Sequence, residues 1–121
     1  MAIGYSHVAL IGNLGKNPQL IEGHKGTLRA SFTLAVDRMS AEGSEERRER
    51  TDWFPIVAWG RVAETCRDRL TKGSWVFILG RLQVQHWQDE QGDRHHITEV
   101  VAQEVILLDG PETDAEGQEP S

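Results

Sequence analysis

The sequence contains a single cysteine, Cys66, among its 121 residues. One thiol cannot form a disulfide or a cysteine-based zinc site within the chain, which fits a reducing compartment. No apolar run approaches the roughly 20 residues of a membrane-spanning helix. The first residues also have neither the charged leader nor the apolar stretch of a signal peptide. We therefore expect a cytoplasmic protein without a membrane partner.

Motifs for catalysis are missing from the sequence as well. It has no nucleophile motif, phosphate-binding loop or zinc-binding HExxH. His95 and His96 are neighbours in a predicted strand and point to opposite faces, which prevents them from holding one ion together. A metal-dependent nuclease is the weakest alternative, because the acids lie mainly in loops and near the C-terminal end. We expect no enzyme, no metal and no cofactor.

Lysine and arginine are absent from residue 109 onward, where five acidic residues fall. The formal net charge of the chain is -6, which leaves 13 basic against 14 acidic residues in 1–108. Phosphate binding depends on local basic side chains rather than on total charge, so the composition neither indicates nor excludes a nucleic-acid partner. Rich in Pro, Gly and Glu, residues 109–121 predict a short acidic disordered tail.

The pattern of apolar residues predicts a mainly β chain. Between residues 27 and 36 every second position is apolar, as in a half-exposed strand. Val62, Cys66 and Leu70, four apart, instead predict a short helix that ends at a glycine. The predicted strands cover 6–12, 27–36, 51–60, 74–87 and 94–108, and the helix covers 61–70. Five strands with one short helix between strands 3 and 4 match an OB-fold barrel, which often binds oligonucleotides. We predict one such domain over residues 1–108.

Two of these segments carry further expectations. In the strand over 74–87, the even positions predict core residues, namely Val76, Ile78, Leu82 and Val84. Residues 37–50 contain almost no apolar side chain and so cannot order themselves by burial. That segment fits a mobile hairpin loop, a short exposed helix, or an extension of its flanking strands beyond the barrel.

Three tryptophans, Trp53, Trp59 and Trp87, occupy positions that strand periodicity allows to face outward. Exposed Trp usually marks an interface, and stacking a base on Trp contributes about 1–3 kcal/mol without reading sequence. Burial in the core or in a subunit interface is the alternative for each, and we favour it for Trp75. Basic side chains could bind phosphates between these platforms or be ordinary solvated charges. The candidates are Arg29, Arg47, Arg48, Arg50, Arg61, Lys72, Arg81 and Arg94.

Four stretches together form a more specific pattern. They are VALIGNLG over 8–15 with Pro18, TDW over 51–53 leading to VAWGRVAE over 57–64, Lys72-Gly73 with Val76, Gly80 and Leu82, and Trp87 with TEVV over 98–101. With these motifs the chain resembles the bacterial-type single-stranded DNA-binding proteins, SSB, over about residues 3–108.

The resemblance implies an OB-fold homotetramer that wraps single-stranded DNA without sequence preference. Such a protein protects DNA at the nucleoid during replication, repair and recombination. In the family, stacking aromatics fall where this chain has Trp53, Trp59 and Trp87, and basic contacts fall at Arg61 and Lys72. His86 stands where a lysine is common, which weakens that contact at neutral pH.

The chain departs from the family pattern in two places. Some members carry a further stacking tryptophan just after the second strand, where this chain reads Arg38-Met39-Ser40. The family's flexible linker with an acidic, apolar-ended tip recruits other genome-maintenance proteins. Here it is reduced to ETDAEGQEPS, which has the acidic charge but lacks the apolar end.

Two other binding functions use the same fold. A dimeric primosome-type OB protein would serve helicase loading and favour a protein partner. An interaction domain would bury its exposed tryptophans against a protein surface. Oligomer size and the response of tryptophan fluorescence to oligo-dT distinguish these functions from the first.

Overall fold

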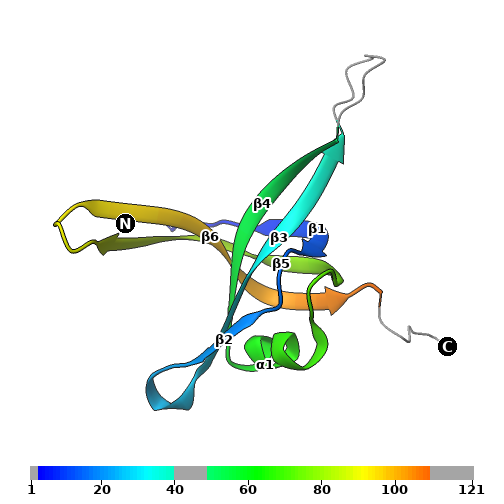
Figure 1. Ribbon diagram of the computed structural model, residues 1–121, viewed down its shortest axis with the longest axis horizontal. Helices are drawn as coiled ribbons and strands as arrows, with labels where there is room; N and C mark the ends of the chain where they lie inside the picture. The colour runs from blue at the N-terminus through cyan, green and yellow to red at the C-terminus, as the bar shows by residue number, and fades with distance from the viewer. Residues whose placement is uncertain (1–2, 40–48, 110–121) are drawn as a thin grey trace.

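The computed structural model describes residues 3–39 and 49–109 of the chain (Figure 1). The predicted helix and all five predicted strands are confirmed, with ends displaced by at most three residues. The elements are β1 (Val8–Leu14), β2 (Gln19–Glu22), the 3-10 turn η1 (His24–Gly26), β3 (Leu28–Met39), β4 (Glu49–Trp59), α1 (Gly60–Arg69), β5 (Trp75–Gln88) and β6 (Arg94–Leu107).

The short strand β2 was not expected from the sequence. It has four residues, all exposed, and pairs with the edge of β3. A strand without a buried face carries no apolar alternation, so periodicity does not reveal it. β2 adds a sixth strand to the sheet but lies outside the barrel circuit.

The remaining five strands pair in a closed circuit. β1 pairs with β5 over Val8–Asn13 and, at Asn13 and Leu14, also pairs with β3. The circuit continues from β5 to β6, from β6 to β4 and from β4 back to β3. β4 and β6 run parallel, while the other pairs are antiparallel. This closed arrangement confirms the OB-fold.

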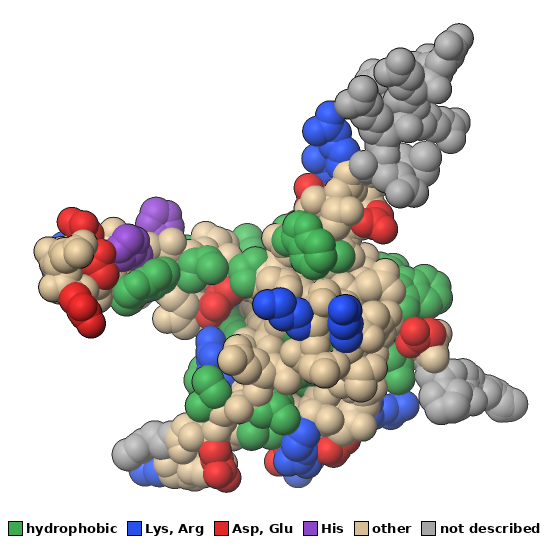
Figure 2. Space-filling view, viewed as in Figure 1, with side chains coloured by type: hydrophobic (Ala, Val, Ile, Leu, Met, Phe, Trp, Pro, Cys, Tyr) green, Lys and Arg blue, Asp and Glu red, His purple; other side chains and the backbone are tan. Residues whose placement is uncertain are grey.

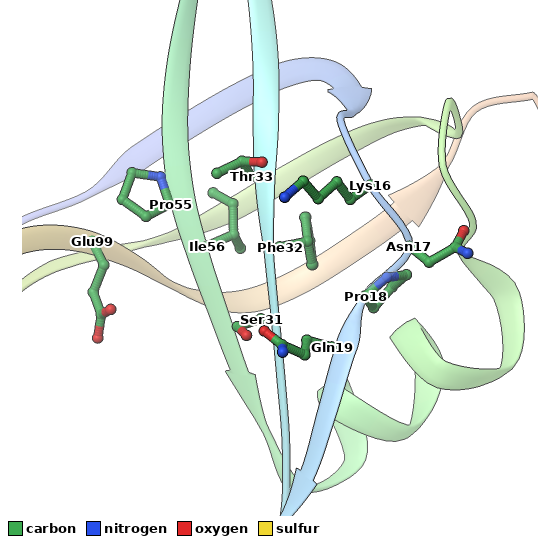
Figure 3. A pocket seen from close by; sticks show the side chains of 10 residues that line it. All are labelled: Lys16, Asn17, Pro18, Gln19, Ser31, Phe32, Thr33, Pro55, Ile56 and Glu99. Carbon is green, nitrogen blue, oxygen red and sulfur yellow. The ribbon is translucent and has the colours of Figure 1, made fainter.

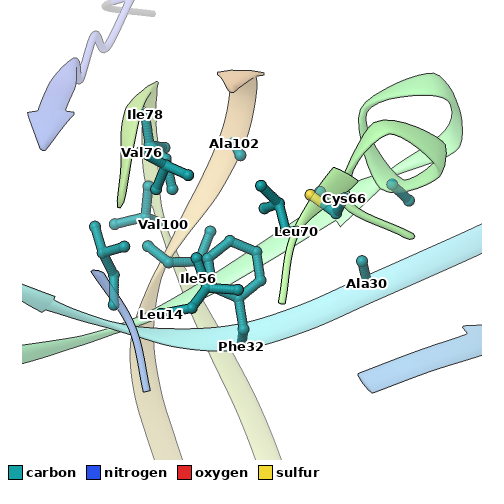
Figure 4. Close-up of a cluster of buried hydrophobic side chains, with 13 residues drawn as sticks. Leu14, Ala30, Phe32, Ile56, Cys66, Leu70, Val76, Ile78, Val100 and Ala102 are labelled. Carbon is teal, nitrogen blue, oxygen red and sulfur yellow. The ribbon is translucent and has the colours of Figure 1, made fainter. Parts of the chain in front are cut away.

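The core fills the circuit, and α1 covers one end of it (Figures 1 and 4). Side chains from β3, β4, β5 and β6 meet inside, and Cys66 and Leu70 pack against them from α1 and its end. Burial in these apolar surroundings raises the pKa of the Cys66 thiol to about 11. The thiol therefore stays protonated at neutral pH and is a packing residue rather than a nucleophile.

Two strand pairs extend beyond the barrel as arms (Figure 1). The β5–β6 arm carries Leu82 and Val84, which are exposed, so the prediction that they belong to the core was wrong. Val76 and Ile78, nearer the start of β5, are fully buried as predicted. The apolar alternation continues along the strand, but past the barrel no second layer of sheet covers it.

The β3–β4 arm shows which structure the two ends of the 37–50 segment adopt. β3 runs to Met39 and β4 begins at Glu49, and the two residues are paired. Both flanks of the segment are therefore strand extensions. Arg47 and Arg48 lie outside the described residues, as do residues 110–121 of the predicted tail.

Two glycines allow the backbones to approach closely where strands bend into the circuit. A Cβ on Gly12 of β1 would collide with the carbonyl oxygen of Ala35 on β3. A Cβ on Gly80 would collide with the carbonyl oxygen of Val101, at a register shift between β5 and β6. Any side chain at these positions would force neighbouring strands apart.

We expect Gly80→Ala to lower the free energy of unfolding by about 1–3 kcal/mol, because the added methyl group meets backbone that cannot rotate away. Urea unfolding measures the loss. Gly4→Ala is the matched control, since a Cβ there meets no atom within 4 Å. Equal stability of the Gly80→Ala protein and the unmodified protein would contradict the close approach.

Candidate nucleic-acid interface

The strand register places the three predicted tryptophans on one continuous face. Trp53 and Trp59 alternate with core residues of β4 and so point outward. Between them, Val57 is paired with Val101 of β6, which is paired with Arg81 of β5. Paired residues project to the same side of a sheet. Every second residue of β5 after Arg81 projects to this same outward side, and Trp87 is one of these residues.

All three tryptophans are exposed. Their exposed fractions are 58% for Trp53, 43% for Trp59 and 50% for Trp87. The prediction that they face outward is therefore confirmed, and the alternative of burial in the core is wrong. Trp75 is 45% exposed as well, so it is not buried in the core. Burial in a subunit interface, the other half of the prediction for Trp75, stays a prediction.

Neighbouring groups hold two of these indole rings in place. Trp53 packs on the loop after β1, where a Cβ on Gly15 would lie 2.6 Å from the indole Cζ3. Trp59 is covered on one side by Arg29, whose Cζ lies 5.6 Å from the ring centroid. A guanidinium at this distance makes a cation–π contact and brings positive charge beside the ring. Both rings are thereby held in place while remaining exposed to solvent.

Trp87 is supported by the facing strand of its arm. The ring of His95 on β6 stacks on it at a centroid distance of 5.4 Å and an interplanar angle of 22°. The His95 Nε2 lies 2.8 Å from Oδ2 of Asp89 in the loop between β5 and β6. Asp89 Oδ1 also accepts bonds from the backbone N–H groups of Gln91 and Asp93. The carboxylate therefore links the hairpin turn to the stacked pair.

A buried carboxylate lies between the platforms. Glu99 of β6 is only 7% exposed, and its Oε2 accepts hydrogen bonds from the Nε2 groups of Gln83 and Gln85, each 3.0 Å long. Glu99 lines a pocket of about 490 Å³ whose other walls come from β3, β4 and the segment around β2. In Figure 3 the Lys16 side chain extends from the loop after β1 toward β3 in the same pocket.

A model of the single-strand binding protein family matches residues 5–108, which is most of the chain and nearly all of the described fold. The chain belongs to this family. The single-stranded DNA-binding protein 1 of Chlorobaculum tepidum is 41% identical over 109 residues, covering 89% of this chain and 67% of the relative. The single-stranded DNA-binding protein 3 of Clostridium acetobutylicum is 42% identical over 104 residues, covering 84% and 69%.

A solved structure of a family member has the same architecture. It is the Plasmodium falciparum SSB in complex with single-stranded DNA, with a TM-score of 0.81 and 25% sequence identity. The similarity covers 90% of this chain and 99% of the solved chain. The resemblance inferred from the sequence motifs is thus confirmed at the level of both family and fold.

The basic residues of this family member are distributed unevenly around the tryptophan face. Arg29 and Arg81 project from the central sheet, and Arg94 lies beside Trp87 on the arm. Arg50 is at the start of β4 on the other arm. Arg61, on α1, lines a separate depression with the end of β6, and Lys72 lies in the turn before β5. Figure 2 shows basic side chains at the centre of one face, close to hydrophobic ones.

Several residues of the face were missed by reasoning from the sequence. Lys16 reaches the pocket from a loop, and the contact between Glu99 and the two glutamines needs the β5–β6 register. That register follows from the hairpin turn at residues 89–93, so a hairpin alignment of the two strands could have found it. Arg38, near the end of β3, donates its Nε–H to Asp52 over 2.7 Å.

Two further observations concern metals and membranes. Within residues 3–39 and 49–109, no three His, Cys, Asp or Glu side chains gather where they could hold a metal ion. No helix in the described part of the chain is long and apolar enough to span a bilayer.

The hydrogen bond between Asp89 and His95 on the β5–β6 arm leads us to expect a pH-dependent contribution to stability. The hydrogen bond from His95 is the main cause that lowers the pKa of Asp89, helped by backbone N–H groups and opposed by desolvation. Because the carboxyl pKa is lower in the folded than in the unfolded protein, ionised Asp89 stabilises the fold at pH values above the pKa of an unfolded aspartate, about 3.9. This stabilisation is lost as the pH falls through the pKa of Asp89 in the folded protein. We expect Asp89→Asn to lower Tm at pH 7 and to leave it unchanged in acid below both pKa values. A Tm deficit that persists in acid would assign Asp89 a role independent of its charge.

Proposed function

We propose that this chain binds single-stranded DNA along one face, by stacking bases on Trp53, Trp59 and Trp87 while neighbouring Arg and Lys side chains neutralise phosphates. The observation that carries the proposal is the register, which aligns three exposed indoles on one outward side of β4 and β5. Membership of a family whose members bind single-stranded DNA and are not enzymes supports it.

The stacking and phosphate contacts proposed on this face do not select a sequence. Every base has a π-face that can stack on an indole. Phosphate contacts from Arg29, Arg81 and Arg94 are likewise independent of the bases. Binding of this kind protects exposed single strands in replication, repair and recombination, and we place the protein at the nucleoid in the cytoplasm.

We further propose that residues 1–108 form the DNA-binding domain, which assembles as a homotetramer, and that 109–121 form a short acidic tail. Support comes from an exposed apolar patch on the part of the circuit made by β1, β5 and β6. In it, the exposed side chains of Ile11 and Ile106 flank the half-buried Phe77 across three paired strands, with the exposed Trp75 beside them. Exposed apolar surface of this kind marks an interface. The patch lies where the start of β5 pairs with β1, whereas the tryptophan face lies where β6 pairs with β4, so we expect assembly to leave the tryptophan face open.

Titration of the tryptophan fluorescence with oligo-dT tests the DNA-binding proposal. We expect deep quenching by single strands and none by a duplex of equal length. The logarithm of the binding constant should fall linearly with the logarithm of the salt concentration, with a slope of about 0.7 for each phosphate neutralised. Absence of quenching would overturn the proposal and assign the exposed tryptophans to a protein partner.

Replacement of single tryptophans tests the platforms individually. We expect Trp53→Leu, Trp59→Leu and Trp87→Leu each to weaken binding of a labelled oligo-dT, measured by anisotropy. The loss should be about 5- to 140-fold, because stacking one base contributes about 1–3 kcal/mol. Trp75→Leu removes an equally exposed indole from the proposed subunit interface instead, and a variant that light scattering shows to be still a tetramer should keep its affinity. Equal effects at all four positions would contradict the assignment.

Light scattering of a patch variant tests the assembly. We expect Ile106→Glu to convert tetramers into smaller species, because a charge cannot be buried in an apolar interface without a partner. Leu20→Glu places the same charge on the exposed strand β2 and should keep the tetramer. A protein that is already a dimer before substitution would indicate a primosome-type assembly instead.

A further inference from the structure

Glu99 is an unexpected residue for a face that attracts phosphates. Its carboxylate lies among the proposed DNA contacts, yet no Lys, Arg or His side chain forms an ion pair with it among the described residues. Its partners, Gln83 and Gln85, are neutral. A phosphate would be repelled by this carboxylate, since both carry negative charge. A group that approaches it favourably must instead donate a hydrogen bond.

The carboxylate has unused acceptor capacity. Both glutamine amides donate to Oε2, and no described residue donates to Oε1. An ionised carboxylate offers about four acceptor sites, and leaving a buried acceptor without a partner is unfavourable. Because Glu99 lines an open pocket, a bound molecule can supply the missing donor there.

The other walls of the pocket suit a nucleotide. Lys16 supplies a positive charge for a phosphate, and Ser31 and Thr33 supply hydroxyl groups from β3. Pro55 of β4, the residue opposite Thr33, provides a small apolar surface. Figure 3 shows these side chains coming from the loop, β3 and β4, with Glu99 on β6 at the far side. A backbone held at Lys16 would present a base edge toward Glu99.

Base edges differ in what they offer a carboxylate. Cytosine carries an exocyclic N4 amino group, which is the group that Glu and Asp side chains accept from. Thymine and uracil carry a carbonyl oxygen at that position, and their N3–H donor stands between two carbonyl oxygens that the carboxylate repels.

We infer that Glu99 is a base-reading residue, whose Oε1 accepts a hydrogen bond from the exocyclic amino group of a base in this pocket. The protein thereby favours cytosine over uracil or thymine at one position of the bound strand. The inference rests on the proposed DNA-binding function and adds to it a bias that stacking alone does not create.

Oligo-dC and oligo-dU of equal length form a matched pair of probes, because their bases differ only in the group at position 4 and in the proton on N3. Anisotropy titrations are made at mildly alkaline pH, where cytosine is neutral. We expect Glu99→Gln to reduce the preference for oligo-dC over oligo-dU by roughly fivefold or more. The glutamine carbonyl must receive the bonds from Gln83 and Gln85, so its amide N–H₂ takes the place of Oε1. There it donates to the uracil O4, and the preference turns toward oligo-dU.

Glu104→Gln is the control, because it removes the same charge from an exposed position of the same strand. It should leave the dC to dU ratio unchanged. Equal tightening of both probes by Glu99→Gln would overturn base reading and leave phosphate repulsion as the role of Glu99. An unchanged ratio with a lowered Tm would also overturn it, in favour of a structural role. Failure of the unmodified protein to bind either probe would instead refute the proposed function.

Discussion

The fold depends on one strand pairing with two partners at once. β1 runs along β5 up to Asn13, and at Asn13 and Leu14 it also pairs with β3. Without that second pairing the five strands would form an open sheet with exposed edges. The switch requires close backbone contact, and Gly12 allows it because a Cβ there would collide with Ala35. Closure then encloses the core, which α1 covers at one end.

Closure also determines which surface is left for binding. Side chains that alternate inward fill the barrel, so those that alternate outward must face solvent or a partner. On β3 and β4 the outward positions include Arg29 and Trp59, whose guanidinium and indole are in contact. Beyond the barrel, the arms expose both of their faces. The β5–β6 arm therefore presents Trp87 on one side and Leu82 on the other, so that both sides expose an apolar side chain.

In the proposed complex the tryptophan face combines attraction and repulsion for the same polyanion. Arg29, Arg81 and Lys16 would attract phosphates, whereas Glu99 would repel them over a short range. In a bound strand this arrangement would direct the backbone toward the basic side chains and a base edge toward the carboxylate. Two neutral glutamines hold the carboxylate without cancelling its charge, which a lysine or arginine partner would do.

The sequence by itself determined the helix, the five strands of the barrel, the family and the positions at which tryptophans can face outward. Alternation over 27–36 and the four-residue spacing of Val62, Cys66 and Leu70 are local signals, because strand and helix periods act within a few residues. Tertiary structure alone decided what depends on distant pairing or on where the barrel ends. The exposure of Leu82 and Val84 is one case, since their local pattern equals that of Val76 and Ile78. The contacts of Glu99 and Lys16 are the other, because residues far apart in the chain meet only once strands and loops are in register.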